Sequence, residues 1–309
     1  MSGKVLITGG FGNLGSWITL HLVSLGYDIY VLTRKEKHKF ENIKYSVIEC
    51  DITNLDELKE KLNFDIDFCI HTASFNEFFL PNYPQNALAI NTLGTRNILE
   101  VLSTKNLKNF IYFSTFHVYG IQSGIVDENT VVNPKNDYAS THLFAEYYVK
   151  QFAYTHNLKY TIFRLTNSYG APTFNDTTKW YLVLNDLVKS AYENKQIIIT
   201  SNGKVKRDFI HMGDVSQIVN YILQINATND IYNLSSNKNY KIIELANIVK
   251  KVYIKRYNKD IEIQINNNDK TMYEDIKVKS DKLKNIINFE INDMFEDEIN
   301  KIFNTLEEK

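Results

Sequence analysis

Cysteine is nearly absent from the chain: Cys50 and Cys69 are the only two among 309 residues. A disulfide framework is therefore not expected, and we interpret both as small apolar side chains in a reducing cytoplasm. Long apolar runs are also missing, since none approaches the roughly 20 residues that a helix needs to cross a bilayer. The first residues, MSGKVLITGG, pass directly into a strand-like segment and lack the layout of a signal peptide. We therefore expect a cytoplasmic protein.

An excess of charge of one sign is lacking too. Lys and Arg number 35 against 36 Asp and Glu, a formal net charge of −1, so neither a nucleic acid nor a membrane is indicated as a partner. The seven histidines show no ligand-like spacing with carboxylates, which disfavours a metal-dependent enzyme. The remaining composition, 44% hydrophobic and 23% charged, is typical of a globular protein with one large domain or two modest ones.

Short strand-like segments alternate with helical patterns through the first half of the chain. The strand-like segments are KVLITGG, DIYVLTR, YSVIECD, FCIHTAS, FIYFST and KYTIFRL, and the helical patterns cover residues 13–25, 85–105 and 138–154. This alternation predicts an α/β fold with a doubly wound parallel sheet that helices cover on both faces.

The regular alternation of strands and helices ends after Leu165, where a loop-rich connection begins. Beyond it we expect helices near 180–193, after RDFIHMGD, at 242–257 and near 292–306, and strands at QIIIT, IYNLSS and 261–265. The pattern predicts a main domain of residues 1–169, to which 204–235 return, and a smaller lobe formed by 170–203 and 236–309.

The segment TGGFGNLG, residues 8–15, joins the first expected strand to the first expected helix. Glycines at such a turn let the backbone bend tightly and approach a pyrophosphate, and the helix N-terminus behind them presents free N–H groups. The alternative is a glycine turn with a structural role alone. Because the pattern stands between strand and helix, as the mechanism requires, we predict a dinucleotide site. Its residues are Gly9, Gly12, Asn13, Leu14 and Gly15.

The residues after the second strand bear on which dinucleotide is bound. An acidic residue there would hydrogen-bond the ribose hydroxyls of NAD(H), but this chain has Thr33 and Arg34. A guanidinium can pair with the ribose phosphate of NADP(H) or stack on adenine, so we lean slightly to NADP(H) over NAD(H). A solvated basic turn is the alternative. Asp51 and Ile52, after the third strand, are placed to meet the adenine.

Several segments with separate roles follow one another in a recognisable order: TGGFGNLG, HTAS, NTLGTRNILE, FSTFHVYG, YAST, FRLTNSYG and RDFIHMGD. In this the chain resembles the extended short-chain dehydrogenase/reductases that act on nucleotide sugars, namely epimerases, dehydratases, ketoreductases and 4-dehydrogenases. The resemblance covers nearly the whole chain. It implies a Rossmann domain at 1–169 and 204–235, a C-terminal lobe that binds a nucleotide-sugar substrate, and a homodimer made by pairing helices.

The resemblance also implies roles for individual residues. Thr115 stands where the family hydrogen-bonds the reacting sugar oxygen, Tyr138 is its acid/base tyrosine, and His142 occupies the third catalytic position. Tyr138 and His142 would also contact the cofactor, as would Ala73 and Asn91. Residues at substrate-contacting positions are Ser74, Phe75, Phe116, His117, Asn167 and Arg207, the last two at the diphosphate and nucleoside. For His117 the preferred alternative is a packed or hydrogen-bonded histidine.

Two departures from the family pattern affect the chemistry. Dehydratases carry an Asp-Glu pair where this chain has Phe116 and His117, and phenylalanine cannot protonate a leaving hydroxyl, so 4,6-dehydration is not expected. At His142 the family has a lysine, which binds the nicotinamide ribose and lowers the tyrosine pKa. A tyrosine of pKa about 10 needs roughly 4 kcal/mol of phenolate stabilisation to act as a base near pH 7. An unperturbed histidine would be charged in about a quarter of molecules at that pH.

Three interpretations of His142 stay open. It could replace the lysine with weaker activation, it could fix the ribose while an oxidised nicotinamide supplies the field, or the chemistry could be lost. Because Tyr138 and Thr115 are retained, we expect an oxidoreductase acting at carbon 4 of a nucleotide-linked hexose or heptose, a 4-dehydrogenase or 4-ketoreductase. A 4-epimerase is the alternative, placed second because bulky Phe75 and Phe116 would restrict rotation of the keto-sugar. A non-catalytic cofactor-binding protein is the alternative of another class.

Overall fold

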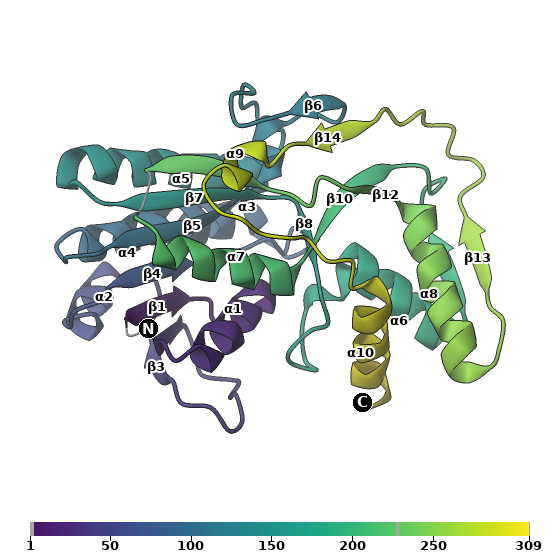
Figure 1. The fold of residues 1–309 in the computed structure, drawn as a ribbon, viewed down its shortest axis with the longest axis horizontal. Coiled ribbons are helices and arrows are strands. Elements are labelled where there is room, and N and C mark those ends of the chain that lie inside the picture. Colours follow the sequence, from purple (N-terminus) through teal and green to yellow (C-terminus); the bar gives the residue numbers. More distant parts are fainter. Residues whose placement is uncertain (1–2, 227–228, 309) are drawn as a thin grey trace.

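The structure, a computed structural model, describes residues 3–226 and 229–308. Its centre is a seven-stranded parallel sheet with the strand order β11-β7-β5-β4-β1-β2-β3 (Figure 1). The strands are β1 Lys4–Thr8, β2 Asp28–Thr33, β3 Ser46–Glu49, β4 Phe68–His71, β5 Asn109–Thr115, β7 Tyr160–Leu165 and β11 Asp230–Leu234. The predicted α/β class with a doubly wound parallel sheet is confirmed.

Apolar side chains on both faces of the strands explain why the sheet is covered on both sides. Along β1, Val5 and Ile7 join a core with α1 and α7, whereas Leu6 points into a second core with α2, α4 and α5. Period-two alternation places these neighbours on opposite faces. The covering helices are α1 Asn13–Ser24, α2 Leu55–Lys61, α4 Thr95–Leu102, α5 Asp137–His156 and α7 Met212–Gln224.

A third core lies beside the sheet, where α6, α8 and α10 pack together (Figure 1). Its elements are β8 Asn167–Tyr169, η3 Lys179–Tyr181, α6 Val183–Asn194, β9 Gln196–Ile199, β10 Lys206–His211, β12 Asn239–Lys241, α8 Ile242–Tyr257, β13 Glu262–Ile265 and α10 Phe295–Glu307. Strand β10 pairs with β8 and β12 in a small separate sheet, and β9 pairs with β13. The domain boundaries given above remain a prediction.

A returning segment connects this third core to the main sheet. It contains β14 Ile276–Val278, which pairs with β6 Gly124–Val126, and α9 Asp281–Lys284. Leu283 and Ile287 of this segment are buried in the same core as α1 and α7. Although these residues fall within the predicted smaller lobe, they pack on the main sheet.

One expected helix, residues 85–105, has a different form. It consists of α3 Tyr83–Ala87, a π-helical segment η1 Leu88–Gly94, and α4. At the end of η1 the Thr95 hydroxyl donates to the Asn91 carbonyl at 2.6 Å, a side-chain bond that competes with regular backbone pairing. No helix in the described part of the chain is long and apolar enough to cross a membrane.

Candidate active site

A cavity of about 720 Å³ opens at the carboxyl ends of β1, β4, β5 and β7. The chain reverses its strand order between β1 and β4, and ligands of open α/β sheets bind at such a point. The third core supplies the opposite wall through β8, β10 and the start of α6. Predicted residues that line this single cavity are Gly9, Gly12, Asn13, Leu14, Gly15, Ser74, Thr115, His117, Tyr138, His142, Asn167 and Arg207.

The glycine loop fits the close approach of a pyrophosphate. Gly9 has φ +69°, and a Cβ on Gly15 would lie 2.2 Å from the Gly9 carbonyl oxygen. Helix α1 begins at Asn13 with no side-chain cap, so its first N–H groups face the cavity free. The Oδ1 atom of Asn13 is buried without a hydrogen-bond partner among the described residues. A dinucleotide, whose diphosphate would accept from these N–H groups, fits this cradle.

Tyr138 and Thr115 meet because β5 ends where α5 begins. Thr115 is the last residue of β5, and Tyr138 lies in the first turn of α5, which Asn136 caps by accepting from the Ala139 N–H at 2.9 Å. Burial raises the pKa of Tyr138 to about 12, although a hydrogen bond with the Thr115 side chain acts in the opposite direction. The phenol is therefore protonated at neutral pH and needs a positive charge to become a base.

His142 does not supply that charge. Its ring lies 4.6 Å from the Tyr138 ring, it is only 3% exposed, and its Nδ1 lies 2.8 Å from the Tyr112 hydroxyl. Burial, with a smaller contribution from His117, lowers the pKa of His142 to about 3. The charged fraction of about a quarter applies to an unperturbed histidine, whereas burial keeps this ring neutral near pH 7.

The other nitrogen of His142 faces the cavity. Its Nε2 atom is buried and has no hydrogen-bond partner among the described residues, although the side chain lines the cavity. A buried polar atom without a partner is costly, so a ligand group that pairs with His142 Nε2 would stabilise the site. A neutral imidazole whose Nδ1 pairs with Tyr112 fits a hydroxyl of a bound dinucleotide ribose.

Arg207 places an uncompensated cation on the opposite wall. Arg207 is exposed at the cavity wall, partial desolvation lowers its pKa, and in the described part of the chain no carboxylate lies within ion-pair distance of it. The guanidinium stays charged, because an arginine pKa remains far above neutral. Asn167, on the neighbouring strand β8, is fixed by donating to the Asp208 carbonyl at 2.9 Å. This wall fits an anion such as a diphosphate.

Other predicted cofactor residues lie outside the cavity lining. Asp51 caps a turn by accepting from the Thr53 N–H at 2.9 Å, and Ile52 is buried against Gly94. Thr33 donates to the Lys35 carbonyl, and Arg34 is exposed. Ala73 packs at the edge of the second core. Their contact with the adenosine remains a prediction.

Asn91 has a structural contact that the sequence did not indicate. Its Oδ1 accepts from the Phe75 N–H at 2.6 Å, and its Nδ2 donates to the Phe75 carbonyl and to Thr141. It therefore holds the loop after β4 against α5. Neither Phe75 nor Phe116 lines the cavity: Phe75 stacks on Tyr83, and Phe116 packs with a small core around Val118.

Sequence patterns missed a polar cluster at the cavity wall. Lys179 of η3 donates to Asn76 at 2.6 Å, forms an ion pair with Glu77, and lies 3.2 Å from the Tyr181 hydroxyl. The cluster joins the loop after β4 to the third core across more than one hundred residues of sequence. No periodicity or motif marks the segment TKWY, so nothing in the sequence indicated it.

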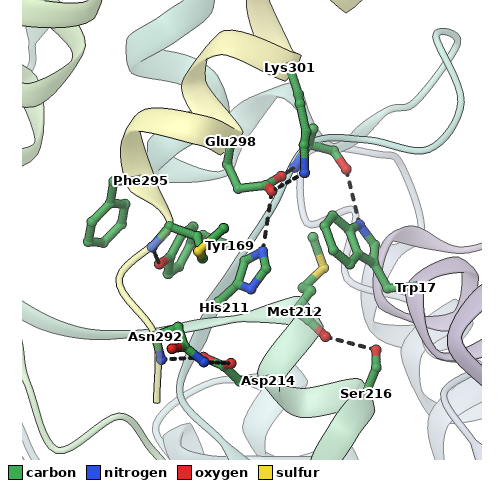
Figure 2. A network of polar contacts seen from close by, with 12 residues as sticks. Trp17, Tyr169, His211, Met212, Asp214, Ser216, Asn292, Phe295, Glu298 and Lys301 are labelled. Atoms are coloured by element: carbon green, nitrogen blue, oxygen red, sulfur yellow. Dashed lines mark hydrogen bonds and ion pairs between the residues drawn. The ribbon is translucent and has the colours of Figure 1, made fainter. Parts of the chain in front are cut away.

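A buried network docks the last helix behind this wall (Figure 2). Glu298 of α10 is fully buried and accepts from the Ala171 N–H and from Lys301, both at 2.7 Å, while His211 lies at 3.3 Å. Burial alone would raise the pKa of Glu298, but these donors hold it below its usual value. Trp17 of α1 donates to the Ala171 carbonyl at 3.1 Å, which ties the glycine-loop helix to the same network.

Comparison with known proteins agrees with this geometry. A model of the NAD dependent epimerase/dehydratase family matches residues 5–235. A putative UDP-glucose 4-epimerase of Methanocaldococcus jannaschii is 31% identical over 254 residues, which span 80% of this chain and 81% of that protein. The dTDP-D-glucose 4,6-dehydratase of Dictyostelium discoideum is 25% identical, and the match spans 79% of this chain and 60% of that protein.

Solved structures show the same fold. The UDP-glucuronic acid 4-epimerase from Bacillus cereus, in complex with UDP-glucuronic acid and NAD, superposes with a TM-score of 0.80 at 21% identity, covering 99% of both chains. The UDP-glucose 4-epimerase from Thermotoga maritima, with UDP-glucose, gives a TM-score of 0.82 at 20% identity, covering 99% of both chains. The resemblance seen in the motifs is thus confirmed, and the chain belongs to the NAD dependent epimerase/dehydratase family.

Proposed function

We propose that the protein is a nucleotide-sugar 4-epimerase that uses a bound nicotinamide dinucleotide. The observation that carries the proposal is the shared cavity, whose lining includes Tyr138, Thr115, the glycine loop and Arg207. A sugar whose diphosphate pairs with Arg207 would extend towards the phenol, where the nicotinamide end of a dinucleotide held by the glycine loop would also reach. Epimerases recur among the similar proteins, which also supports this choice.

The preference for net oxidoreduction over epimerisation loses its physical reason. It assumed that Phe75 and Phe116 would crowd the reacting sugar, but neither side chain lines the cavity. An epimerase must let its keto-sugar present the other face, and neither of these two rings stands in the lining to oppose that rotation. A net 4-dehydrogenase or 4-ketoreductase is therefore the second candidate.

The mechanism follows from the positions of the side chains. A bound nicotinamide would accept hydride from the sugar carbon and return it. Thr115 orients the C4 hydroxyl, and Tyr138, as the phenolate, accepts its proton and then returns it to the same oxygen. Arg207 and Asn167 hold the diphosphate while the sugar turns. His142 orients the ribose through its unpartnered Nε2.

The experiment is turnover of UDP-, dTDP-, GDP- and CDP-sugars by the purified protein, with products separated by chromatography and assigned by NMR. Inversion at C4 without net change in added cofactor is expected, and Tyr138→Phe should reduce it by about 10²-fold or more. Net accumulation of a 4-keto sugar would favour the dehydrogenase. Cofactor binding without turnover of any sugar nucleotide would favour the non-catalytic alternative.

The identity of the cofactor can be tested in the same preparation. The family description names NAD, whereas exposed Arg34 after β2 supports our lean to NADP(H). Binding constants of NAD and NADP for the wild type and for Arg34→Ala would distinguish the two. The lean to NADP(H) predicts that Arg34→Ala weakens NADP binding by about tenfold with little effect on NAD.

We also propose a homodimer through α5 and η1, which pack side by side. Both present large exposed side chains, with exposures of 46–52%: Leu88, Leu93, Phe144 and Tyr147. Because the partner would be a second copy, the same face must be self-complementary. Light scattering should report a dimer that Phe144→Lys with Tyr147→Lys converts to a monomer. The control Met272→Lys alters another exposed apolar side chain elsewhere.

A further inference from the structure

One segment of the chain reaches from the third core to the loop after β2. It comprises residues 172–178, between β8 and η3. The ring of Phe174 stacks on that of His38 with centroids 4.3 Å apart, and the Phe40 ring lies 5.3 Å from the Phe174 ring. Asp176 Oδ1 lies 3.6 Å from His38 Nδ1, so the segment contacts this histidine through two of its residues. These contacts join parts of the chain that are far apart in the sequence.

The same segment contacts the glycine loop and the helix that follows it. The Phe11 ring of the glycine loop meets the Phe174 ring edge to face, with centroids 6.1 Å apart and planes inclined at 70°. The Phe40 ring is 5.1 Å from the Phe11 ring. In α1, Ser16 Oγ lies 2.8 Å from Thr173 Oγ1 of the segment. We call this cluster the aromatic clasp, and its rings are those of Phe11, His38, Phe40 and Phe174.

A second cavity, of about 240 Å³, lies at the clasp and has Phe11, His38 and Phe174 in its lining. Gly12 and Asn13 line both this cavity and the active-site cavity, so the two cavities meet at the glycine loop. These two residues belong to the cradle that fits a diphosphate, and the adenosine is predicted to lie at the loop after β2. A dinucleotide that extends from the cradle towards that loop would therefore run along the clasp.

We propose that the aromatic clasp closes residues 172–178 over the diphosphate and adenosine of the bound dinucleotide, and that it must open before the dinucleotide leaves. This inference rests on the dinucleotide site that the proposed function uses. Opening parts the Phe174 ring from its aromatic neighbours and exposes apolar surface to water, which is unfavourable and slows release. The segment is continuous with β8 and η3, which carry Asn167 and Lys179 of the opposite cavity wall. Closing the clasp therefore also fixes that wall over the cofactor.

The test measures how fast the dinucleotide leaves. Protein loaded with NADH or NADPH is mixed in a stopped-flow instrument with a large excess of oxidised dinucleotide, and the loss of bound-nicotinamide fluorescence gives the dissociation rate constant. Phe174→Ala should raise this constant by about tenfold or more, whereas Phe174→Tyr, which keeps the ring, should stay within about twofold of the wild type. The control Phe64→Ala removes another half-buried ring, which lies near Lys4 at the start of β1 and lines neither cavity, and should leave the constant unchanged.

Two results overturn the proposal: release at the wild-type rate from folded Phe174→Ala, or an equal acceleration in Phe64→Ala. Thermal unfolding checks that each variant is folded, and if Phe174→Ala does not fold, His38→Ala removes the stacked partner and must show the same acceleration. The readout is separate from turnover. If C4 inversion occurs but release does not depend on the clasp, only the clasp is refuted. If release depends on the clasp while no nucleotide sugar is inverted, the clasp stands and the epimerase proposal is refuted.

Discussion

Replacing His142 by lysine should change the ionisation of Tyr138 more than any other single substitution in the cavity. The protein surrounds this phenol with neutral groups, because burial holds the pKa of His142 at about 3 and raises that of Tyr138 to about 12. Removing the phenol proton near pH 7 therefore costs about 7 kcal/mol before any ligand binds.

The size of the effect follows from the geometry. The rings of His142 and Tyr138 are 4.6 Å apart. A unit positive charge at a similar distance from the phenolate, with an effective dielectric constant of about 20, stabilises it by about 4 kcal/mol. Since one pKa unit corresponds to about 1.4 kcal/mol, His142→Lys should lower the pKa of Tyr138 by about 2 to 3 units.

The assay is the pH dependence of kcat/KM for C4 inversion, together with the phenolate absorbance of the apoprotein during alkaline titration. In the pH profile of kcat/KM, His142→Lys should move the transition assigned to Tyr138 to lower pH by about 2 units. His142→Gln, which adds no charge, should leave it in place, and Tyr138→Phe should remove the phenolate signal of this residue. The reasoning would be refuted if the wild-type pH profile of kcat/KM showed a transition near the ordinary histidine pKa that is lost in His142→Gln. Such a transition would show that the buried ring titrates. Identical profiles for the wild type and a folded His142→Lys would also refute the reasoning.

Three further outcomes are expected. The pKa values of His71 and His142 are both about 3 in the folded protein, below the value of about 6.5 in the unfolded chain. The free energy of unfolding is therefore highest above the unfolded pKa and decreases as the pH falls below it. Urea unfolding should give a free energy lower by about 2 kcal/mol per histidine at pH 5 than at pH 7, and an unchanged midpoint would contradict this. Gly15→Ala should weaken dinucleotide binding more than Gly12→Ala in calorimetry, because its Cβ would lie 2.2 Å rather than 3.0 Å from the Gly9 oxygen. Tyr112→Phe removes the Nδ1 partner of His142 and should cost about 1 to 3 kcal/mol of stability and weaken cofactor binding, whereas unchanged thermal unfolding and affinity would count against a positioning role.

The sequence was most informative where local pattern alone decides the structure. The strands of the central sheet are buried on both faces, so they appear as short continuous apolar runs such as KVLIT and FCIH. The glycine loop was equally accessible, since strand, turn and helix are contiguous in the chain. The motif order indicated Asn167 and Arg207, and both line the cavity although β8 and β10 are about forty residues apart; their contact with the substrate remains a prediction.

Residues that act through distant contacts could not be identified in this way. Lys179 meets Asn76 and Glu77 only after the chain has folded, and the segment around it has neither periodicity nor a motif. Side-chain direction was also beyond the sequence. Phe75 and Phe116 are bulky and follow the predicted site residues Ser74 and Thr115, yet neither lines the cavity: Phe75 stacks on Tyr83, and Phe116 packs in a small core around Val118. Size at a neighbouring position does not determine which way a side chain points.

The protonation state of His142 also could not be predicted from the sequence, because it depends on what surrounds the ring in the fold. An isolated histidine titrates near neutral pH, but this ring is enclosed and paired with Tyr112, so it is neutral. The nearby cations do not replace the missing charge, because Lys179 is paired with Glu77 and Arg207 faces the site predicted for the diphosphate. The chain alone therefore holds Tyr138 as an acid. In the proposed mechanism, the positive charge that makes it a base would come from a bound oxidised dinucleotide, which would confine proton abstraction to the loaded protein.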